Sequence, residues 1–202
     1  QTCALPICLT ERGRDIARLP IDPTVSRMIL QARDEHALSE VLIIASAISV
    51  QDPRDRPLEE QEAADQMHRR FRDERSDFIA YLNIWNAYHK QMEKASQNQM
   101  RKFCKAHYLS YVRMREWRDI HAQIHQTLKE IGRFPFNSEH AEYDAIHRAV
   151  LTGLLGNIAQ KKEGNMYRAA RGRDVMIFPG SGLFKRPQKE TESTEKEGRA
   201  PA

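Results

Sequence analysis

Residues 108–131, YLSYVRMREWRDIHAQIHQTLKEI, decide the fold because their pattern predicts one long amphipathic helix. Apolar side chains recur on one side of a 3.6-residue period, whereas basic, aromatic and amide side chains occupy the other side. The apolar side comprises Trp117, Ile120, Ile124, Leu128 and Ile131, and the polar side comprises Tyr111, Arg115, Arg118, Gln126 and Lys129. The apolar side needs a core, and the polar side offers groups that contact phosphates and stack on bases.

Arg113 is a charged residue on the apolar side of this helix. It lies four residues before Trp117 and therefore falls within the apolar side. An unpaired charge is costly to bury, so the guanidinium of Arg113 requires a carboxylate, a carbonyl or a ligand as its partner.

Length and composition set the broad class. The chain has 202 residues, of which 40% are hydrophobic and 30% are charged, and its formal net charge is +4. These values predict a helix-rich protein with a charged surface and more than one packed unit. The mild basic bias is compatible with nucleic acid as a partner but does not establish it.

Apolar run length and cysteine usage indicate where in the cell the protein is expected. No apolar run approaches the length of a membrane span, so residues 41–50 are interpreted as a buried helix, and we expect no membrane partner. The three cysteines form no CxxC pair, which argues against a disulfide framework and a zinc ribbon. A reducing, cytoplasmic location fits this cysteine usage.

Helical spacing, caps and breakers predict further helices around the long one. The predicted ranges are 9–19, 25–32, 39–50, a solvated helix at 59–74, a helix after Ser76, 97–107 and 139–155. We expect Ser39, Ser76 and Ser138 to cap the helices that follow them, and Gly132 to end the long helix. The proline-bounded connection 52–57 is interpreted as a boundary between packed units.

Beyond Gly156 the pattern changes from helical to β. Residues 166–170 and 174–178 predict two short strands, which form only a marginally stable unit without further partners. The polar residues 188–202 predict a disordered tail. Residues 1–8 are interpreted as foreign or truncated sequence.

Catalytic motifs do not emerge from the sequence. No GxxxxGK[ST] loop is present, so this chain alone is not expected to hydrolyse ATP, and the glycine-rich residues 180–182 are interpreted as a turn. His121 and His125 have the spacing of metal ligands but lack the glutamate of an HExxH motif, so no metal site is expected. Cys104 is interpreted as a buried structural cysteine rather than a nucleophile paired with His107.

A basic and aromatic set remains as the strongest functional signal. It comprises Arg101, Lys102, Lys105, Tyr108, Tyr111, Arg113, Arg115 and Arg118. From composition alone, a solvated helix face is the commoner explanation of such a set, and nucleic-acid binding is the main alternative. Trp85 and Trp117 are expected to anchor the core.

Several motifs, taken in order, resemble DEAH-box RNA helicases. Residues 9–23, LTERGRDIARLPIDP, resemble the end of the winged-helix region of that family. The ratchet, or helicase-associated, region is similar to residues 48–57 (ISVQDPRDRP), 76–85 (SDFIAYLNIW) and 111–120 (YVRMREWRDI), most closely in the bacterial HrpA-like branch. Residues 177–185, IFPGSGLFK, resemble the early strands of the OB-fold that follows.

The resemblance implies a mainly α fold, in which a helical ratchet-like bundle has a partial winged helix before it and an incomplete, OB-like β unit after it. The implied division of the chain is 1–8 unmatched, 9–52 the end of the winged helix and the first helices of the helicase-associated region, 53–156 the ratchet-like domain, 157–187 the partial OB-fold and 188–202 the tail.

The resemblance also implies a function. The family comprises ATP-driven 3′-to-5′ translocases on single-stranded RNA, whose RecA-like motor domains hold ATP and Mg and would lie upstream of this chain. This chain would bind and guide RNA without catalysing a reaction itself. The implied RNA-contacting or interdomain residues are Arg113, Arg115, Arg118, Lys102 and Lys185.

Two other functions compete with this interpretation. The chain can be a free-standing helical module that binds protein through apolar surface left bare by its incomplete flanks. A DNA-binding regulator built on a residual winged helix is weaker, because the helix at 27–33 lacks a preceding helix and a wing.

Overall fold

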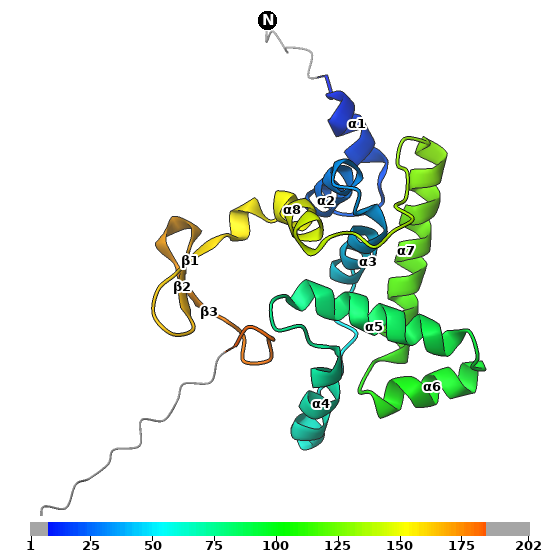
Figure 1. Cartoon of the computed structure of the whole chain (residues 1–202), viewed down its shortest axis with the longest axis vertical. Coiled ribbons are helices and arrows are strands. Elements are labelled where there is room, and N and C mark those ends of the chain that lie inside the picture. The colour runs from blue at the N-terminus through cyan, green and yellow to red at the C-terminus, as the bar shows by residue number, and fades with distance from the viewer. Residues whose placement is uncertain (1–7, 185–202) are drawn as a thin grey trace, which may run out of the picture.

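The computed structural model describes residues 8–184, which form eight α-helices followed by a small antiparallel sheet (Figure 1). This confirms the mainly α fold with a partial β unit. The helices are α1 Glu11–Arg18, α2 Pro23–Asp34, α3 Leu38–Ile48, α4 Gln61–His68, α5 Asp77–Met92, α6 Gln97–Ala106, α7 Tyr111–Ile131 and α8 Tyr143–Gly153. In this part of the chain, no helix is long and apolar enough to cross a membrane.

Helix α7 is the long helix that the sequence predicts, and it runs along one side of the bundle (Figure 1). Its buried side chains are Met114, Trp117, Ile124 and Leu128, whereas Ile120 and Ile131 are half-buried. The indole N–H of Trp117 donates to the carbonyl of Ile43 and to the hydroxyl of Ser46, each at 3.0 Å. Trp117 is therefore a core anchor, as predicted.

The helices enclose two adjoining hydrophobic clusters. The first lies among α1, α2, α3, α8 and the C-terminal half of α7, and includes Met28 and Leu128. The second lies among α5, α6 and the start of α7, and includes Tyr88 and Trp117. Ile43 of α3 packs against both clusters. Helix α3 thus connects the two packed units, whereas the domain limits given above stay a prediction.

Local signals locate some helix ends correctly. The hydroxyl of Ser76 accepts from the amide of Phe78 at 3.2 Å, and Gly132 ends α7 with a φ of 73°. Both predicted ends are confirmed. Ser110 adds a cap at the start of α7, where its hydroxyl accepts from the amide of Arg113.

The predicted caps at Ser39 and Ser138 are wrong. Helix α3 begins at Leu38, and α8 begins only at Tyr143. The amide of Ser39 donates to the side-chain oxygen of Asn137 at 2.8 Å, and the Asn137 amide group donates to Glu40 at 2.9 Å. These tertiary hydrogen bonds fix an extended 132–142 connection where local preference alone favours an earlier helix start.

The charged stretch 59–74 also differs from the predicted solvated helix. It forms a short 3-10 turn at Leu58–Glu60, the helix α4 and a second 3-10 turn at Arg69–Phe71. His68 and Phe71 are buried. The ring of His68 contacts the carbonyl of Tyr108 at 2.9 Å through Nε2, so this stretch packs against the α6–α7 connection.

The C-terminal sheet has three strands in the order β1-β2-β3. Strands β2 Met166–Ala169 and β3 Asp174–Met176 are the two that the sequence predicts, and β1 Ala159–Lys161 is additional because its polar sequence gives no alternating signal. All neighbours pair antiparallel. The predictions for residues 1–7, for Lys185 and for the 188–202 tail lie outside the described residues.

A glycine attaches the segment after β3 to the helices. The amide of Gly182 donates to the Asp77 carboxylate at 2.9 Å, and a Cβ at Gly182 would lie 2.3 Å from the carbonyl oxygen of Asp73. The backbone can approach the start of α5 this closely only because residue 182 has no side chain.

Candidate nucleic-acid interface

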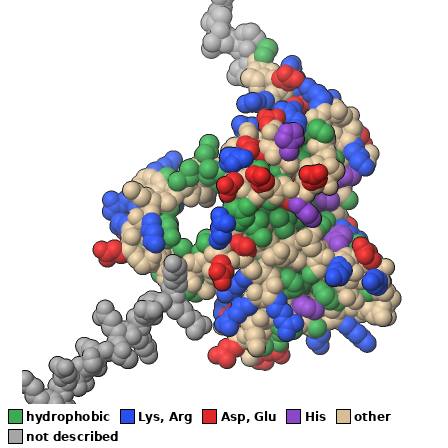
Figure 2. Space-filling view, in the orientation of Figure 1, with side chains coloured by type: hydrophobic (Ala, Val, Ile, Leu, Met, Phe, Trp, Pro, Cys, Tyr) green, Lys and Arg blue, Asp and Glu red, His purple; other side chains and the backbone are tan. Residues whose placement is uncertain are grey.

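The predicted basic set gathers at the corner where α6 meets α7. Helix α6 begins with a reciprocal cap, in which the hydroxyl of Ser96 accepts from the amide of Gln99 and the Gln99 side chain accepts from the amide of Ser96. The same end of the molecule carries Lys and Arg side chains over α4 and α6, with acidic side chains among them (Figure 2). The corner therefore presents positive charge without forming a uniformly basic face.

Arg115 has the geometry expected of a ligand contact. It is exposed, and no hydrogen bond or ion pair holds its guanidinium within residues 8–184. It lines a shallow groove of about 500 Å³ together with Arg101, Tyr111, Val112, Glu116 and Asp119. The guanidinium of Arg101 lies 5.4 Å from the centre of the Tyr111 ring. Two cations, two carboxylates and one aromatic ring thus share this groove.

Arg118 and Lys102 flank the groove differently. Arg118 donates to the sulfur of Met92 at 3.4 Å and lies 3.6 Å from the Asp119 carboxylate, so protein contacts partly hold its guanidinium. Lys102 is exposed on α6, and no group in the described part of the chain pairs with its ammonium. Lys102 and Arg115 are therefore less constrained than Arg118.

Arg113 is partly exposed and points toward the 52–57 connection. One guanidinium nitrogen, Nη1, donates to the carbonyl of Asp52 at 3.1 Å and to the carboxylate of Asp55 at 3.2 Å. The exposed fraction of the Arg113 side chain is 27%. The carbonyl and carboxylate required by its position are thus supplied within the chain, and Arg113 joins α7 to this connection.

Comparison with known proteins identifies the region. Residues 22–81 match the helicase associated domain (HA2), ratchet-like. Over 182 residues the chain is 49% identical to the ATP-dependent RNA helicase HrpA of Escherichia coli (strain K12), an alignment that covers 90% of this chain and 14% of that protein. This chain is a helicase-associated region of the DEAH-box, HrpA-like type.

Further relatives show the same relationship. The HrpA homolog of Haemophilus influenzae is 48% identical over 90% of this chain and 14% of its own length. The probable ATP-dependent RNA helicase DHX35 of Homo sapiens is 27% identical over 85% of this chain and 24% of its own length. The HrpA-like region therefore spans about 14% of the length of its HrpA relatives, and the similarity extends beyond 22–81 to include α7.

Sequence reasoning missed Arg54, which organises the connection beneath α7 in this HrpA-like region. Arg54 donates to the Asp52 carboxylate at 2.6 Å and lies 5.5 Å from the centre of the Tyr81 ring. Burial opposes its charge, but the hydrogen bond and the charge of Asp52 outweigh burial and raise the pKa of Arg54. The motif at 48–57 was a signal for this arrangement, but the pairing within it depends on the fold.

The histidines of α7 belong to a packed aromatic layer. The ring of His121 lies 4.6 Å from that of Trp85, and His125 lies 4.6 Å from Phe136, measured between ring centres. Burial, with smaller effects of His125 and His89, lowers the pKa of His121 to about 4. The described residues contain no group of three potential metal ligands. His121 is thus a neutral packing residue at pH 7.

Cys104 occupies the core of the second cluster, as predicted for a structural cysteine. Burial raises the pKa of its thiol to about 11. A thiol with this pKa is protonated at neutral pH and is a poor nucleophile.

Proposed function

We propose that this chain is a non-motor part of an ATP-dependent 3′-to-5′ RNA helicase, and that it binds and guides single-stranded RNA across the α6–α7 corner. The observation that carries the proposal is the unpaired Arg115 in a groove beside the Tyr111 ring, within a chain that is 49% identical to an ATP-dependent RNA helicase. Lys102 and Arg118 extend the same positive surface.

RNA binding at the α6–α7 corner would depend on contacts with phosphate groups. Unpaired guanidinium and ammonium groups displace counterions from a phosphate backbone when they bind it, and an aromatic ring can stack on any base. Contacts of this kind hold a strand while permitting it to move, because they do not read its sequence. Guiding a strand during translocation requires that property.

The parent protein would supply the catalytic domains that this chain lacks. RecA-like motor domains of the same polypeptide would bind ATP and Mg, and would perform the hydrolysis for which this chain has no P-loop. We assign the β1–β3 sheet to the partial OB-fold expected at 157–187. Residues 177–184, which belong to the segment that resembles the early OB strands, follow β3 and form turns rather than strands. We also propose a cytoplasmic location, on the cysteine usage of the chain.

The test is binding of a fluorescent single-stranded RNA to the 202-residue chain across a salt series. The affinity should fall as salt rises, with a logarithmic slope of about −0.7 for each phosphate contacted. Replacing Arg115 and Arg118 with Ala should weaken binding of unrelated RNA sequences to the same extent and should make the salt slope shallower.

Arg12→Ala provides the matched control. Arg12 is an exposed arginine on α1 that has no hydrogen bond or ion pair in the described part of the chain. Its replacement should leave RNA affinity unchanged. Salt-independent binding, or an equal loss in Arg12→Ala and in the Arg115→Ala, Arg118→Ala double variant, would refute the assignment of the RNA path to α7.

A further inference from the structure

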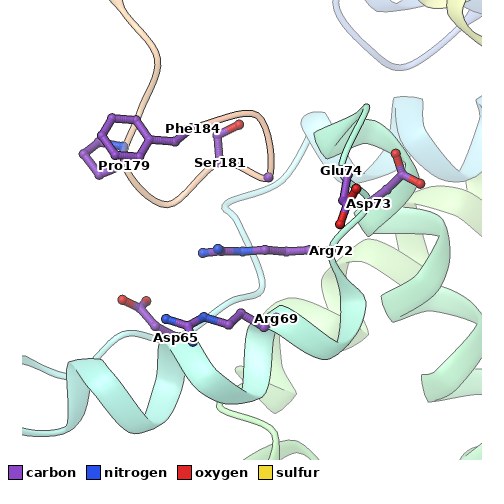
Figure 3. A pocket seen from close by; sticks show the side chains of 9 residues that line it. Asp65, Arg69, Arg72, Asp73, Glu74, Pro179, Ser181 and Phe184 are labelled. Atoms are coloured by element: carbon purple, nitrogen blue, oxygen red, sulfur yellow. The ribbon is translucent and has the colours of Figure 1, made fainter. Parts of the chain in front are cut away.

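A second polar pocket lies away from the α6–α7 corner, between the end of α4 and the 179–184 loop (Figure 3). Its volume is about 490 Å³. Arg72 extends across this space, with Arg69 on one side of it and the loop that carries Ser181 and Phe184 on the other. The walls of the pocket thus come from two segments that are more than a hundred residues apart in the sequence.

Arg72 lacks partners that its position requires. Its Nε is buried and donates no hydrogen bond. No carboxylate lies within ion-pairing distance of Arg69 or Arg72 among residues 8–184. A buried donor without an acceptor is destabilising, and native structures leave few such groups unexplained. An acceptor in the pocket would reach this atom only after a rotation of the Arg72 side chain, because Nε is buried.

The carboxylates that line the pocket either bind other groups or lie at the opposite end of the pocket from the two arginines. Asp65 accepts two hydrogen bonds from Arg56, each at 2.8 Å, and the pKa of Asp65 is lowered chiefly by that contact. Asp73 caps the turn after it by accepting from the amide of Arg75 at 2.8 Å. Asp73 and Glu74 lie at the opposite end of the pocket from the guanidinium groups (Figure 3). Two arginines therefore point into space that no unpaired carboxylate fills.

The loop on the other side is held closely in place. The amide of Gly182 donates to the Asp77 carboxylate, and the amide of Leu183 donates to the hydroxyl of Ser181 at 3.1 Å. The side chain of Phe184 lies beside Pro179 and supplies an apolar wall (Figure 3). The loop closes the pocket only while Gly182 remains seated against the start of α5.

We propose that this pocket binds a phosphate group between Arg69 and Arg72, and that the bound phosphate stabilises the seated position of the 179–184 loop. A guanidinium is planar and presents paired donors that match the oxygens of a phosphate. Phosphate oxygens would accept from the terminal guanidinium nitrogens of Arg69 and Arg72, and a rotation of the Arg72 side chain would bring Nε to an acceptor as well. Because the pocket needs both walls, a ligand that fills it favours the arrangement in which the loop is closed.

The phosphate can belong to a free inorganic ion or to the backbone of a nucleic-acid chain, since both offer the same oxygens. The pocket has room for either. The proposal does not rest on RNA binding at the α6–α7 corner, because none of the residues that form that groove lines this pocket.

The test uses the 202-residue chain in a phosphate-free chloride buffer, titrated by calorimetry in one arm with inorganic phosphate and in the other with a ten-nucleotide single-stranded RNA. Replacing Arg69 or Arg72 with Gln should weaken binding of the phosphate group by at least about tenfold, because each change removes charge-assisted hydrogen bonds. Arg70→Gln is the matched control, since Arg70 is an exposed neighbour that does not line the pocket. This variant should bind like the unaltered chain.

Gly182→Val tests the role of the loop separately. The new side chain would collide with the carbonyl of Asp73 and unseat the loop without removing charge. Its affinity for the phosphate group should also fall by about tenfold if binding and loop closure are coupled. An affinity that Gly182→Val leaves unchanged would contradict the coupling.

The arms also separate the two sources of phosphate. If Arg69→Gln and Arg72→Gln weaken the binding of both inorganic phosphate and RNA, the site accepts free phosphate. If they weaken the binding of RNA alone, the site accepts a backbone phosphate. Absence of binding by both ligands, or equal losses in Arg70→Gln, overturns the proposal. If Arg72→Gln unfolds, the exposed Arg69 variant still decides the question. Replacing Arg115 and Arg118 should not alter phosphate binding here, so failure of RNA guidance at α7 is distinguishable from failure of this site.

Discussion

The guanidinium of Arg113 lies 3.2 Å from the carboxylate of Asp55, and this contact joins the first turns of α7 to the 52–57 connection. The same connection is fixed to the α6–α7 corner through its backbone, since the amide of Asp55 donates to the carbonyl of Tyr108 at 2.8 Å and the amide of Ser110 donates to the carbonyl of Pro53 at 2.8 Å. Arg113 therefore stabilises the corner that carries Arg115 without itself belonging to the exposed groove.

Replacing Arg113 with Ala should lower the free energy of unfolding by about 1–2 kcal/mol, because two charge-assisted hydrogen bonds are lost from a partly exposed site. Urea unfolding measures this change. Arg115→Ala is the control and should alter stability by less than about 0.5 kcal/mol, since Arg115 is exposed and unpaired. Equal stabilities of the two variants would show that the Arg113 contacts contribute nothing to the fold.

Trp117 is the second site at which a small change should have a large effect. Trp117→Phe preserves an aromatic ring but leaves the carbonyl of Ile43 without the indole donor and removes packing from a fully buried position. We expect a loss of about 2–4 kcal/mol in the free energy of unfolding. Trp85→Phe should cost less, because Trp85 is slightly exposed and its indole N–H donates no hydrogen bond to residues 8–184. Thermal or urea unfolding of the pair distinguishes these outcomes.

Gly153 lies where α8 packs tightly against the first turn of α2. A Cβ at this position would lie 2.3 Å from the carbonyl of Thr24 and 2.7 Å from the side chain of Met28. Gly153→Ala should therefore destabilise the protein by about 1–3 kcal/mol, although alanine is the better helix former. Gly156→Ala is the control, because no atom lies within 4 Å of its Cβ position. A neutral or stabilising Gly153→Ala would mean that the two helices separate at little cost.

The ends of the helices and the contact at Gly153 show how far the sequence alone could predict the structure. Periodicity and a terminal glycine predict α7 and its end at Gly132, because both signals are local. The caps expected at Ser39 and Ser138 fail because Asn137 and Glu40 are nearly a hundred residues apart and meet only in the fold. Gly153 carries no local sign that Thr24 will lie against it.

The residues of the candidate sites also divide into those that local sequence predicts and those that depend on contacts between distant segments. The sequence predicts the cations of the α6–α7 corner because they are adjacent in one helical pattern, and it identifies Arg113 as a residue that needs a partner. It does not predict that the partner is Asp55, nor that Arg72 will lie opposite Ser181. Sites assembled from distant segments depend on packing that no local pattern encodes.

His121 should make stability depend on pH in the acidic range. Burial lowers the pKa of His121 to about 4, whereas an unfolded histidine has a pKa of about 6.5. The unfolded state therefore binds a proton first as the pH falls, so stability should decrease between about pH 6.5 and 4 and change no further below the folded pKa. The full effect is about 3.5 kcal/mol, because the pKa difference is about 2.5 units and each unit corresponds to about 1.4 kcal/mol. Urea unfolding at pH 7.5 and at pH 4.5 measures most of this loss.

His121→Leu should remove much of this pH dependence, because an apolar side chain beside Trp85 cannot bind a proton. A smaller dependence should remain, since burial also lowers the pKa values of His68, His89 and His125. His36→Asn is the control, because the exposed side chain of His36 has no hydrogen bond or ion pair in the described part of the chain, and asparagine tolerates the φ of 53° at this position. If His121→Leu and the unaltered chain lose equal stability between pH 7.5 and 4.5, burial of His121 is not the origin of the acid sensitivity.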